Sequence, residues 1–197
     1  MRISPLVFLL SLLSGGILSI PSHAADKKPV SVAPPTSGPE SPVLFVDLRT
    51  NPPGIFHYGS WKDRLGISPS GIVIEGSKGA QGDGGMGRGI DPALDLNTIS
   101  YVEVALGVGA KNEVPEITVA LNDDDGTQVA ARLRIDQIVP NQLVWLHVPR
   151  ESFARASGQD GKDGKMDWSK VAQWQLQGDW TTKKPLNVVF IALRVRK

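Results

Sequence analysis

The sequence predicts an all-β fold, a two-sheet antiparallel β-sandwich with about 8–10 strands and one short helix. Three observations support this prediction. Apolar and polar residues alternate in short runs, Gly, Pro, Asn and Asp separate those runs, and no segment longer than two turns has a helical period. A strand that is apolar on one side buries that side against a second layer, so the pattern predicts two packed sheets.

The expected strands share an apolar residue at every second position. In chain order they span residues 44–48, 71–75, 101–108, 116–122, 127–135, 143–148, 172–177 and 186–195. A turn at 123–126 (Asp-Asp-Asp-Gly) joins two of them as a hairpin, because Asp and Gly accept the backbone angles of tight turns. The short helix is expected at 150–156, directly after Pro149, and a single further helical turn at 91–96.

The first 24 residues have the pattern of a secretory signal. Arg2 is the only charged residue before Asp26, an apolar run follows from residue 6 to 20, and Ser22-His23-Ala24 places small residues at the two positions that a signal peptidase reads. The apolar run is about 15 residues long, whereas a membrane span needs about 20. We therefore expect cleavage after Ala24, no membrane span in the mature protein, and a secreted or periplasmic location.

Residues 25–42 form the next expected unit, a proline-rich tether. Five of these 18 residues are proline and none is aromatic, so the segment cannot bury enough surface to fold. The β-sandwich domain is expected at 43–197. After cleavage the chain carries 20 basic and 20 acidic residues, which argues against nucleic acid as a partner. It has no cysteine, so no disulfide and no lipid-anchored amino terminus are expected.

A glycine-rich stretch at 76–89 resembles a phosphate-binding loop at first sight. Such a loop would end in Gly-Lys-Ser/Thr and lead into a helix, whereas Arg88-Gly89-Ile90-Asp91-Pro92 follows here. The stretch is therefore expected to be a flexible loop, or a glycine-rich strand where backbones approach closely.

Two acidic clusters have the residue types of a calcium site: residues 123–125, and Asp160, Asp163 and Asp167. Neither has the spacing of a twelve-residue calcium loop, and lysines lie between the acids of the second. A hairpin turn and a solvated loop are the expected structures. No cofactor is expected.

Catalytic and zinc-binding patterns are absent from the sequence. His57 and His147 are far apart and have no further ligand at a zinc-binding spacing. There is no Gly-x-Ser-x-Gly motif and no cysteine nucleophile. Asp and Glu are abundant, but nothing selects the pair that a glycosidase would need. The sequence predicts that the protein is not an enzyme.

Aromatic and amide residues give the most informative pattern. Trp174 has the parity of Leu176 and is expected in the core, which leaves Gln173, Gln175 and Gln177 on the outside of their strand. If the strands share a sheet, one outer face combines aromatic rings with amide and guanidinium groups, as sugar recognition requires. If the connections alternate between sheets, the set divides between two faces. The expected ligand residues are Tyr101, Arg132, Arg134, Trp145, His147, Gln173, Gln175 and Trp180.

The order of strands and turns resembles a galactose-binding-like jelly roll, the fold of many carbohydrate-binding modules. The resemblance covers 43–197 and runs through LDLNTISYVEVALGV, EITVALNDDDGTQ, LVWLHVPRESF and MDWSKVAQWQLQGD to a final apolar strand. It implies an Asp in that strand that helps to hold a structural calcium. Ala192 stands at that position instead, so calcium of the family type is not expected.

Two functions follow as expectations. The first is a secreted, non-catalytic carbohydrate-binding module whose partner is a polysaccharide or other glycan. The second is a structural or protein-interaction β-sandwich of the cell envelope without a sugar ligand. It is favoured by the single domain, because carbohydrate-binding modules usually accompany an enzyme and this sequence shows no enzyme domain.

Overall fold

The structure, a computed structural model, describes residues 42–156, 161 and 163–197. The expected signal at 1–24 and the expected tether, apart from Pro42, lie outside the described residues. Within the described part of the chain, no helix is long and apolar enough to cross a membrane.

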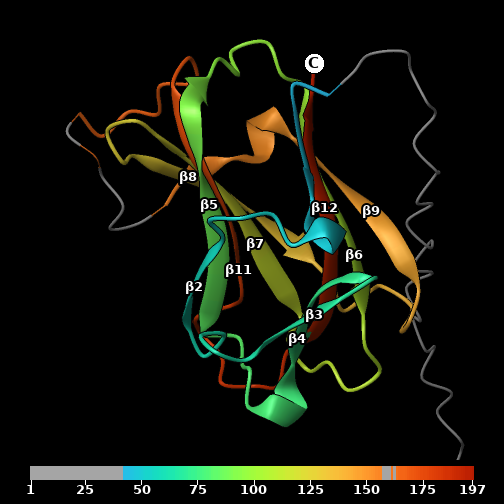
Figure 1. Ribbon diagram of the computed structural model, residues 1–197. Coiled ribbons are helices and arrows are strands. Elements are labelled where there is room, and N and C mark those ends of the chain that lie inside the picture. Colours follow the sequence, from blue (N-terminus) through green and yellow to red (C-terminus); the bar gives the residue numbers. More distant parts are fainter. Residues whose placement is uncertain (1–41, 157–160, 162) are drawn as a thin grey trace, which may run out of the picture. The chain divides into compact units, whose positions relative to one another are not determined.

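Twelve strands and three short 3-10 turns make up the described domain (Figure 1). The strands are β1 (Leu44–Asp47), β2 (Phe56–Gly59), β3 (Leu65–Ser68), β4 (Gly71–Glu75), β5 (Gly84–Leu94), β6 (Tyr101–Val108), β7 (Glu116–Asp123), β8 (Gln128–Arg134), β9 (Leu143–Pro149), β10 (Ala154–Arg155), β11 (Val171–Gln177) and β12 (Asn187–Arg196). The turns are η1 (Leu48–Thr50), η2 (Gly76–Lys78) and η3 (Arg150–Ser152).

The strands form two six-stranded antiparallel sheets. The first sheet has the order β3-β4-β12-β6-β9, and β1 also pairs with β12. The second sheet has the order β10-β8-β7-β11-β5-β2. This architecture confirms the predicted all-β, two-sheet sandwich.

Strand β12 organises the first sheet. One of its edges pairs with β6 along most of its length. Its other edge pairs with β4 over Asn187–Phe190 and with β1 over Ala192–Val195. Strand β12 therefore joins the start of the domain to its middle, so the first sheet is complete only when the ten residues of β12 have paired.

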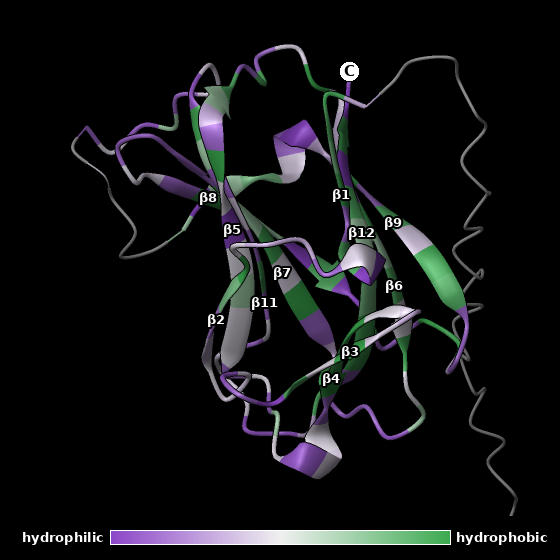
Figure 2. Ribbon diagram, in the orientation of Figure 1, coloured by the Kyte–Doolittle hydropathy of each residue, from purple (hydrophilic) through white to green (hydrophobic). Residues whose placement is uncertain are grey.

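Large side chains fill the space between the sheets. Trp61, Trp174 and Phe190 are fully buried, which confirms the expected core position of Trp174. The Trp61 ring packs at a tilt on Phe190, with 5.9 Å between centroids, and its Nε1 donates a hydrogen bond to the Gln81 carbonyl at 2.9 Å. Figure 2 shows the hydrophobic residues as bands along the strands of both sheets. Burial of these alternate side chains is the main stabilising contribution.

Sequence reasoning missed β2, β3 and β10 because each is short and lies at or next to a sheet edge. The glycine-rich stretch contains η2 and the first part of β5, which agrees with the expected glycine-rich strand. The helix expected at 150–156 is wrong beyond η3, since Ala154 and Arg155 pair with β8. The helical turn expected at 91–96 is also wrong: β5 continues to Leu94 and pairs there with Val171.

The core packing around Trp61 requires glycine at position 84. A Cβ atom added there would lie 2.0 Å from the Trp61 ring, whereas a Cβ added at Gly89 of the same strand has its nearest neighbour at 4.0 Å. We expect Gly84→Ala to lower the free energy of unfolding by about 1–3 kcal/mol through overpacking. Gly89→Ala, the matched control, should change it by less than about 0.5 kcal/mol. Urea titrations measure both, and equal losses would contradict the assignment.

Candidate functional site

The outer face of the second sheet carries aromatic and amide side chains side by side. Its centre is set by the pairing of β2, β5 and β11: Tyr58 lies opposite Gly85, and Gly85 lies opposite Gln177. One register step further, Phe56 lies opposite Gly87, which faces Gln175. Alternation gives all these residues the same orientation, away from inward-facing Met86 and Leu176.

The amides on this face form one hydrogen-bonded network. Gln175 Nε2 donates to Gln173 Oε1 at 3.0 Å and to Asn122 Oδ1 at 3.2 Å. Gln177 Nε2 donates to Gln175 Oε1 at 2.9 Å, and Gln128 Nε2 donates to Asn122 Oδ1 at 3.1 Å. The network crosses β11, β7 and β8, so each amide orientation is held by its neighbours.

Three aromatic rings stand in a row beside the amides. Tyr58 is near-parallel to Phe56, at 6.1 Å between centroids and 24°, and to Trp180, at 6.0 Å and 13°. Tyr58 reaches across β5, and its hydroxyl donates to Gln175 Oε1 at 2.7 Å. Its burial raises the pKa of the Tyr58 phenol, while a hydrogen bond with Gln177 opposes the shift. The phenol is therefore a neutral donor at physiological pH.

Glycines in β5 make room for these rings. A Cβ atom added at Gly85 would lie 2.4 Å from the Tyr58 hydroxyl oxygen, and one added at Gly87 would lie 2.8 Å from the tip of the Phe56 ring. The missing side chains let both rings lean over β5. The glycine-rich stretch thus has a structural role in the aromatic row.

The loop that carries Trp180 is held against the loop before β5. Lys183 forms an ion pair with Asp83, and the Gly82 N–H donates to the Lys184 carbonyl at 3.2 Å. A Cβ atom added at Gly178 would lie 2.0 Å from the Gly82 carbonyl oxygen, so the two backbones are in close contact. Trp180, which is 53% exposed, is thus presented by an anchored loop.

The structure divides the predicted ligand residues between two faces. Gln173, Gln175, Arg132 and Arg134 belong to the outer face of the second sheet, and Trp180 stacks at its edge. Tyr101, Trp145 and His147 lie on β6 and β9 of the first sheet. The single face considered from the sequence is therefore wrong for these three residues, because β9 pairs with β6 and not with β8.

On the first sheet, His147 contacts a buried carboxylate, Trp145 contacts one of the arginines paired with it, and the Tyr101 ring lies edge-on to His147 with 6.4 Å between centroids. Glu103 is 2% exposed although it is on an outer face. His147 Nδ1 lies 2.7 Å from Glu103 Oε1, and the guanidinium groups of Arg194 and Arg196 pair with Oε2. The Arg194 guanidinium in turn lies 3.9 Å from the centroid of the Trp145 ring. Trp145 and His147 are thus both in contact with the ionic cluster around Glu103.

Sequence reasoning missed Phe56 and Tyr58. They belong to a four-residue edge strand, Phe-His-Tyr-Gly, whose only signal is the alternation of two aromatic residues around His57. Both contact the glycines of β5, and that relation between distant segments becomes visible only once the strands are paired.

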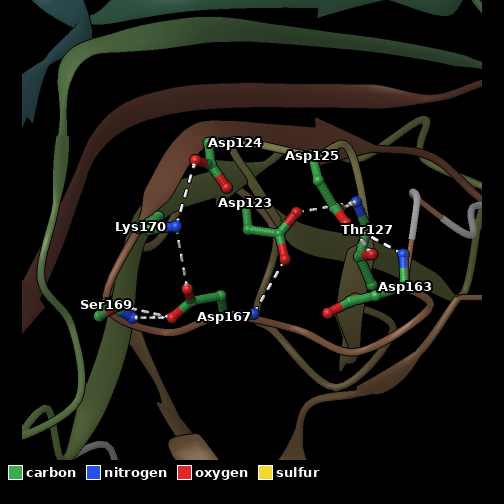
Figure 3. Close-up of polar contacts among 8 residues, drawn as sticks. All are labelled: Asp123, Asp124, Asp125, Thr127, Asp163, Asp167, Ser169 and Lys170. Atoms are coloured by element: carbon green, nitrogen blue, oxygen red, sulfur yellow. Dashed lines mark hydrogen bonds and ion pairs between the residues drawn. The ribbon is translucent and has the colours of Figure 1, made fainter.

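The two acidic segments are joined at one end of the second sheet (Figure 3). Asp123 accepts hydrogen bonds from the backbone N–H groups of Thr127 and Asp167, at 2.9 and 2.8 Å. Asp125 accepts from the backbone and hydroxyl of Thr127 and from the Asp163 N–H. The expected solvated loop is in this respect an anchored one. Asp160 lies outside the described residues.

These contacts move the two carboxyl groups in opposite directions. Burial raises the pKa of Asp123, with Asp125 adding to the shift and the N–H donors opposing it. Hydrogen bonds from Thr127 hold the pKa of Asp125 well below its ordinary value. No group of three His, Asp or Glu side chains among the described residues is arranged to hold a metal ion.

Neither a protein-family model nor a curated protein matches the sequence. The structure is similar to a xylan-binding module, CBM15, with a TM-score of 0.52 and 12% identity over 77% of this chain and 94% of that chain. It is similar to part of an agarase, with a TM-score of 0.53 and 9% identity over 76% of this chain and 24% of the agarase.

A further similar structure is a family 11 carbohydrate-binding module from Clostridium thermocellum, in complex with a β-1,3-1,4-mixed-linked tetrasaccharide. Its TM-score is 0.47, with 12% identity over 72% of this chain and 82% of that chain. The domain has the jelly-roll fold of carbohydrate-binding modules, as the sequence predicted.

The Lys183–Asp83 ion pair gives a prediction for the Trp180 loop. Lys183 is 72% exposed, so its loss should leave the core intact. We expect Lys183→Met to speed amide exchange of residues 179–184 by about threefold to fivefold, the effect of losing an exposed ion pair. Lys184→Met, a neighbouring lysine on the same loop, is the control. Equal exchange in both variants would show that the ion pair does not hold the loop.

The depressed pKa of Asp125 gives a prediction for pH. A carboxyl group whose pKa is lower in the folded than in the unfolded state stabilises the fold above about pH 4 and loses that contribution as pH falls further. Asp125→Asn should therefore flatten the fall in unfolding free energy between about pH 4 and pH 2. Asp91→Asn, at an exposed position in β5, is the control, and an unchanged slope in Asp125→Asn would contradict the prediction.

Proposed function

We propose that the protein is a secreted, non-catalytic carbohydrate-binding module that holds a glycan on the outer face of its second sheet. The observation that carries this proposal is the row of Phe56, Tyr58 and Trp180 beside the amide network of β11, β7 and β8. Aromatic faces pack against the C–H surfaces of sugar rings, and amides form hydrogen bonds with hydroxyl groups. The jelly-roll fold gives independent support.

The lack of catalysis is part of the proposal. Glu116, an acidic side chain on this face, is paired with Arg132 at 3.1 Å. A glycosidase needs two carboxyl groups on either side of the scissile bond, and the amide network offers none. Secretion is proposed from the signal pattern of residues 1–24.

Glycan binding is tested by affinity electrophoresis in gels that contain xylan, mixed-linked β-glucan or agarose. Trp180→Ala should weaken retention by about tenfold without lowering stability, as expected when a stacking contact is lost. Phe45→Ala is the matched control, because Phe45 is 51% exposed on the outer face of the first sheet. No retention of the unmodified protein on a wide panel of polysaccharides would overturn the proposal.

One experimental result would place the glycan-binding site elsewhere, on the first sheet. Tyr101 lines a pocket of about 580 Å³ together with Pro149, Arg150 and Trp168, at the ends of β6 and β9. If Tyr101→Ala abolished retention and Trp180→Ala had no effect, the glycan would bind in that pocket.

A protein-interaction role is the second candidate. It is favoured by exposed apolar side chains on the outer face of the first sheet, where Phe45, Tyr101 and Leu143 are 51%, 42% and 64% exposed. Co-purification of a fixed partner that Phe45→Ala releases, combined with no glycan retention, would support this alternative.

A further inference from the structure

Gln175 has no hydrogen-bonding group left for a ligand. Its Oε1 accepts from Tyr58 and Gln177, and its Nε2 donates to Gln173 and Asn122. An amide oxygen accepts two hydrogen bonds and an amide nitrogen donates two, so all four positions are filled. Gln175 is also only 9% exposed. It is a positioning residue for its neighbours.

The hydrogen-bonding groups that remain available to a ligand lie around Gln175 and include both donors and acceptors. Gln173 uses its oxygen within the network, which leaves its N–H donors for a ligand. Gln177 donates one N–H to Gln175 and also forms a hydrogen bond with the Tyr58 phenol, which leaves its carbonyl oxygen for a ligand. Gln128 is only 4% exposed and, like Gln175, belongs to the fixed part of the network. Fixed donors at Gln173 and a fixed acceptor at Gln177 therefore flank Gln175. Hydroxyl groups, which both donate and accept, match such an arrangement, whereas a carboxylate or sulfate can only accept.

The cationic side chains beside the amides are already paired. Arg132 pairs with Glu116, and Arg134 forms a two-point contact with Asp136. Near Trp180, Lys183 pairs with Asp83. Among the described residues, an anionic ligand on the amide row would therefore lose water without gaining an unpaired arginine beside the amides, and that loss is unfavourable.

The direction of the ligand follows from the two rows. The rings of Phe56, Tyr58 and Trp180 are spaced 6.1 and 6.0 Å apart, starting along β2. The amides of Gln173, Gln175 and Gln177 follow one another along β11. Both strands pair with β5, so the aromatic row and the amide row run side by side. An extended chain parallel to these strands meets successive rings and successive amides at once.

We propose that this face binds an uncharged, linear polysaccharide that lies parallel to β2 and β11 and is recognised through its hydroxyl groups. The proposal rests on the proposed function and names the ligand class for the same site. Gln173 and Gln177 contact hydroxyls, and Tyr58 and Gln175 hold them in orientation.

The test compares polysaccharides that share a backbone and differ in charge. Suitable pairs are hydroxyethyl and carboxymethyl cellulose, xylan without and with glucuronic acid side groups, and methyl-esterified and de-esterified pectin. On each backbone that retains the protein, affinity electrophoresis should give about tenfold weaker retention by the charged member, at low and at high salt. Stronger retention by the charged member that fades with salt would overturn the neutral-ligand proposal and leave glycan binding intact. No retention by any polysaccharide would instead overturn the proposed function.

A variant that adds a cation tests the same point from the protein side. Gln177→Lys should reduce the preference for the neutral member by about threefold or more, because a free ammonium then faces the carboxylate. Ser70→Lys adds the same charge at an exposed turn between β3 and β4 of the first sheet and is the control. An equal effect of both variants would mean that net charge, and not the amide row, sets the preference. Thermal unfolding of each variant checks that the fold is retained.

Discussion

Glycine at three of the first four positions of β5 is the constraint on which both the core and the candidate site depend. On the inner side, Gly84 leaves the space that the Trp61 ring fills. On the outer side, Gly85 and Gly87 leave the space over which Tyr58 and Phe56 lean. One short run of glycines thus allows aromatic rings to approach the same strand from both faces of the sheet, which no larger residue permits.

The long strands could be predicted from the sequence because their side chains alternate. The inward position of Trp174 and the outward positions of Gln173, Gln175 and Gln177 follow from that period alone. Sheet membership does not follow from it. An outward residue on β8 and an outward residue on β9 look alike in sequence, yet β8 pairs with β7 in one sheet and β9 pairs with β6 in the other. Alternation predicts which side chains of a strand face the core, but it does not predict which strands pair with it.

The glycine-rich strand and the edge strand β2 were hard to predict for a related reason. A run of glycines has no side chains that could alternate, and a four-residue strand has too few. Their positions are determined by pairing between segments nearly thirty residues apart, since Tyr58 pairs with Gly85. The two outer faces also use similar residue types differently. On the first sheet, His147 and Arg194 are paired with Glu103. On the second sheet, the amides at the edges of the network retain hydrogen-bonding groups without a partner in the network.

The saturated state of Gln175 separates the face into a fixed centre and adjustable margins. Any substitution at Gln175 would leave several neighbours without a partner at once, so changes there would disturb the whole network. Gln173 and Gln177 each have spare hydrogen-bonding groups, and substitutions at these positions would disturb at most one or two internal contacts. A library of variants built to alter ligand choice should therefore keep Tyr58, Gly85 and Gln175 constant and vary Gln173 and Gln177.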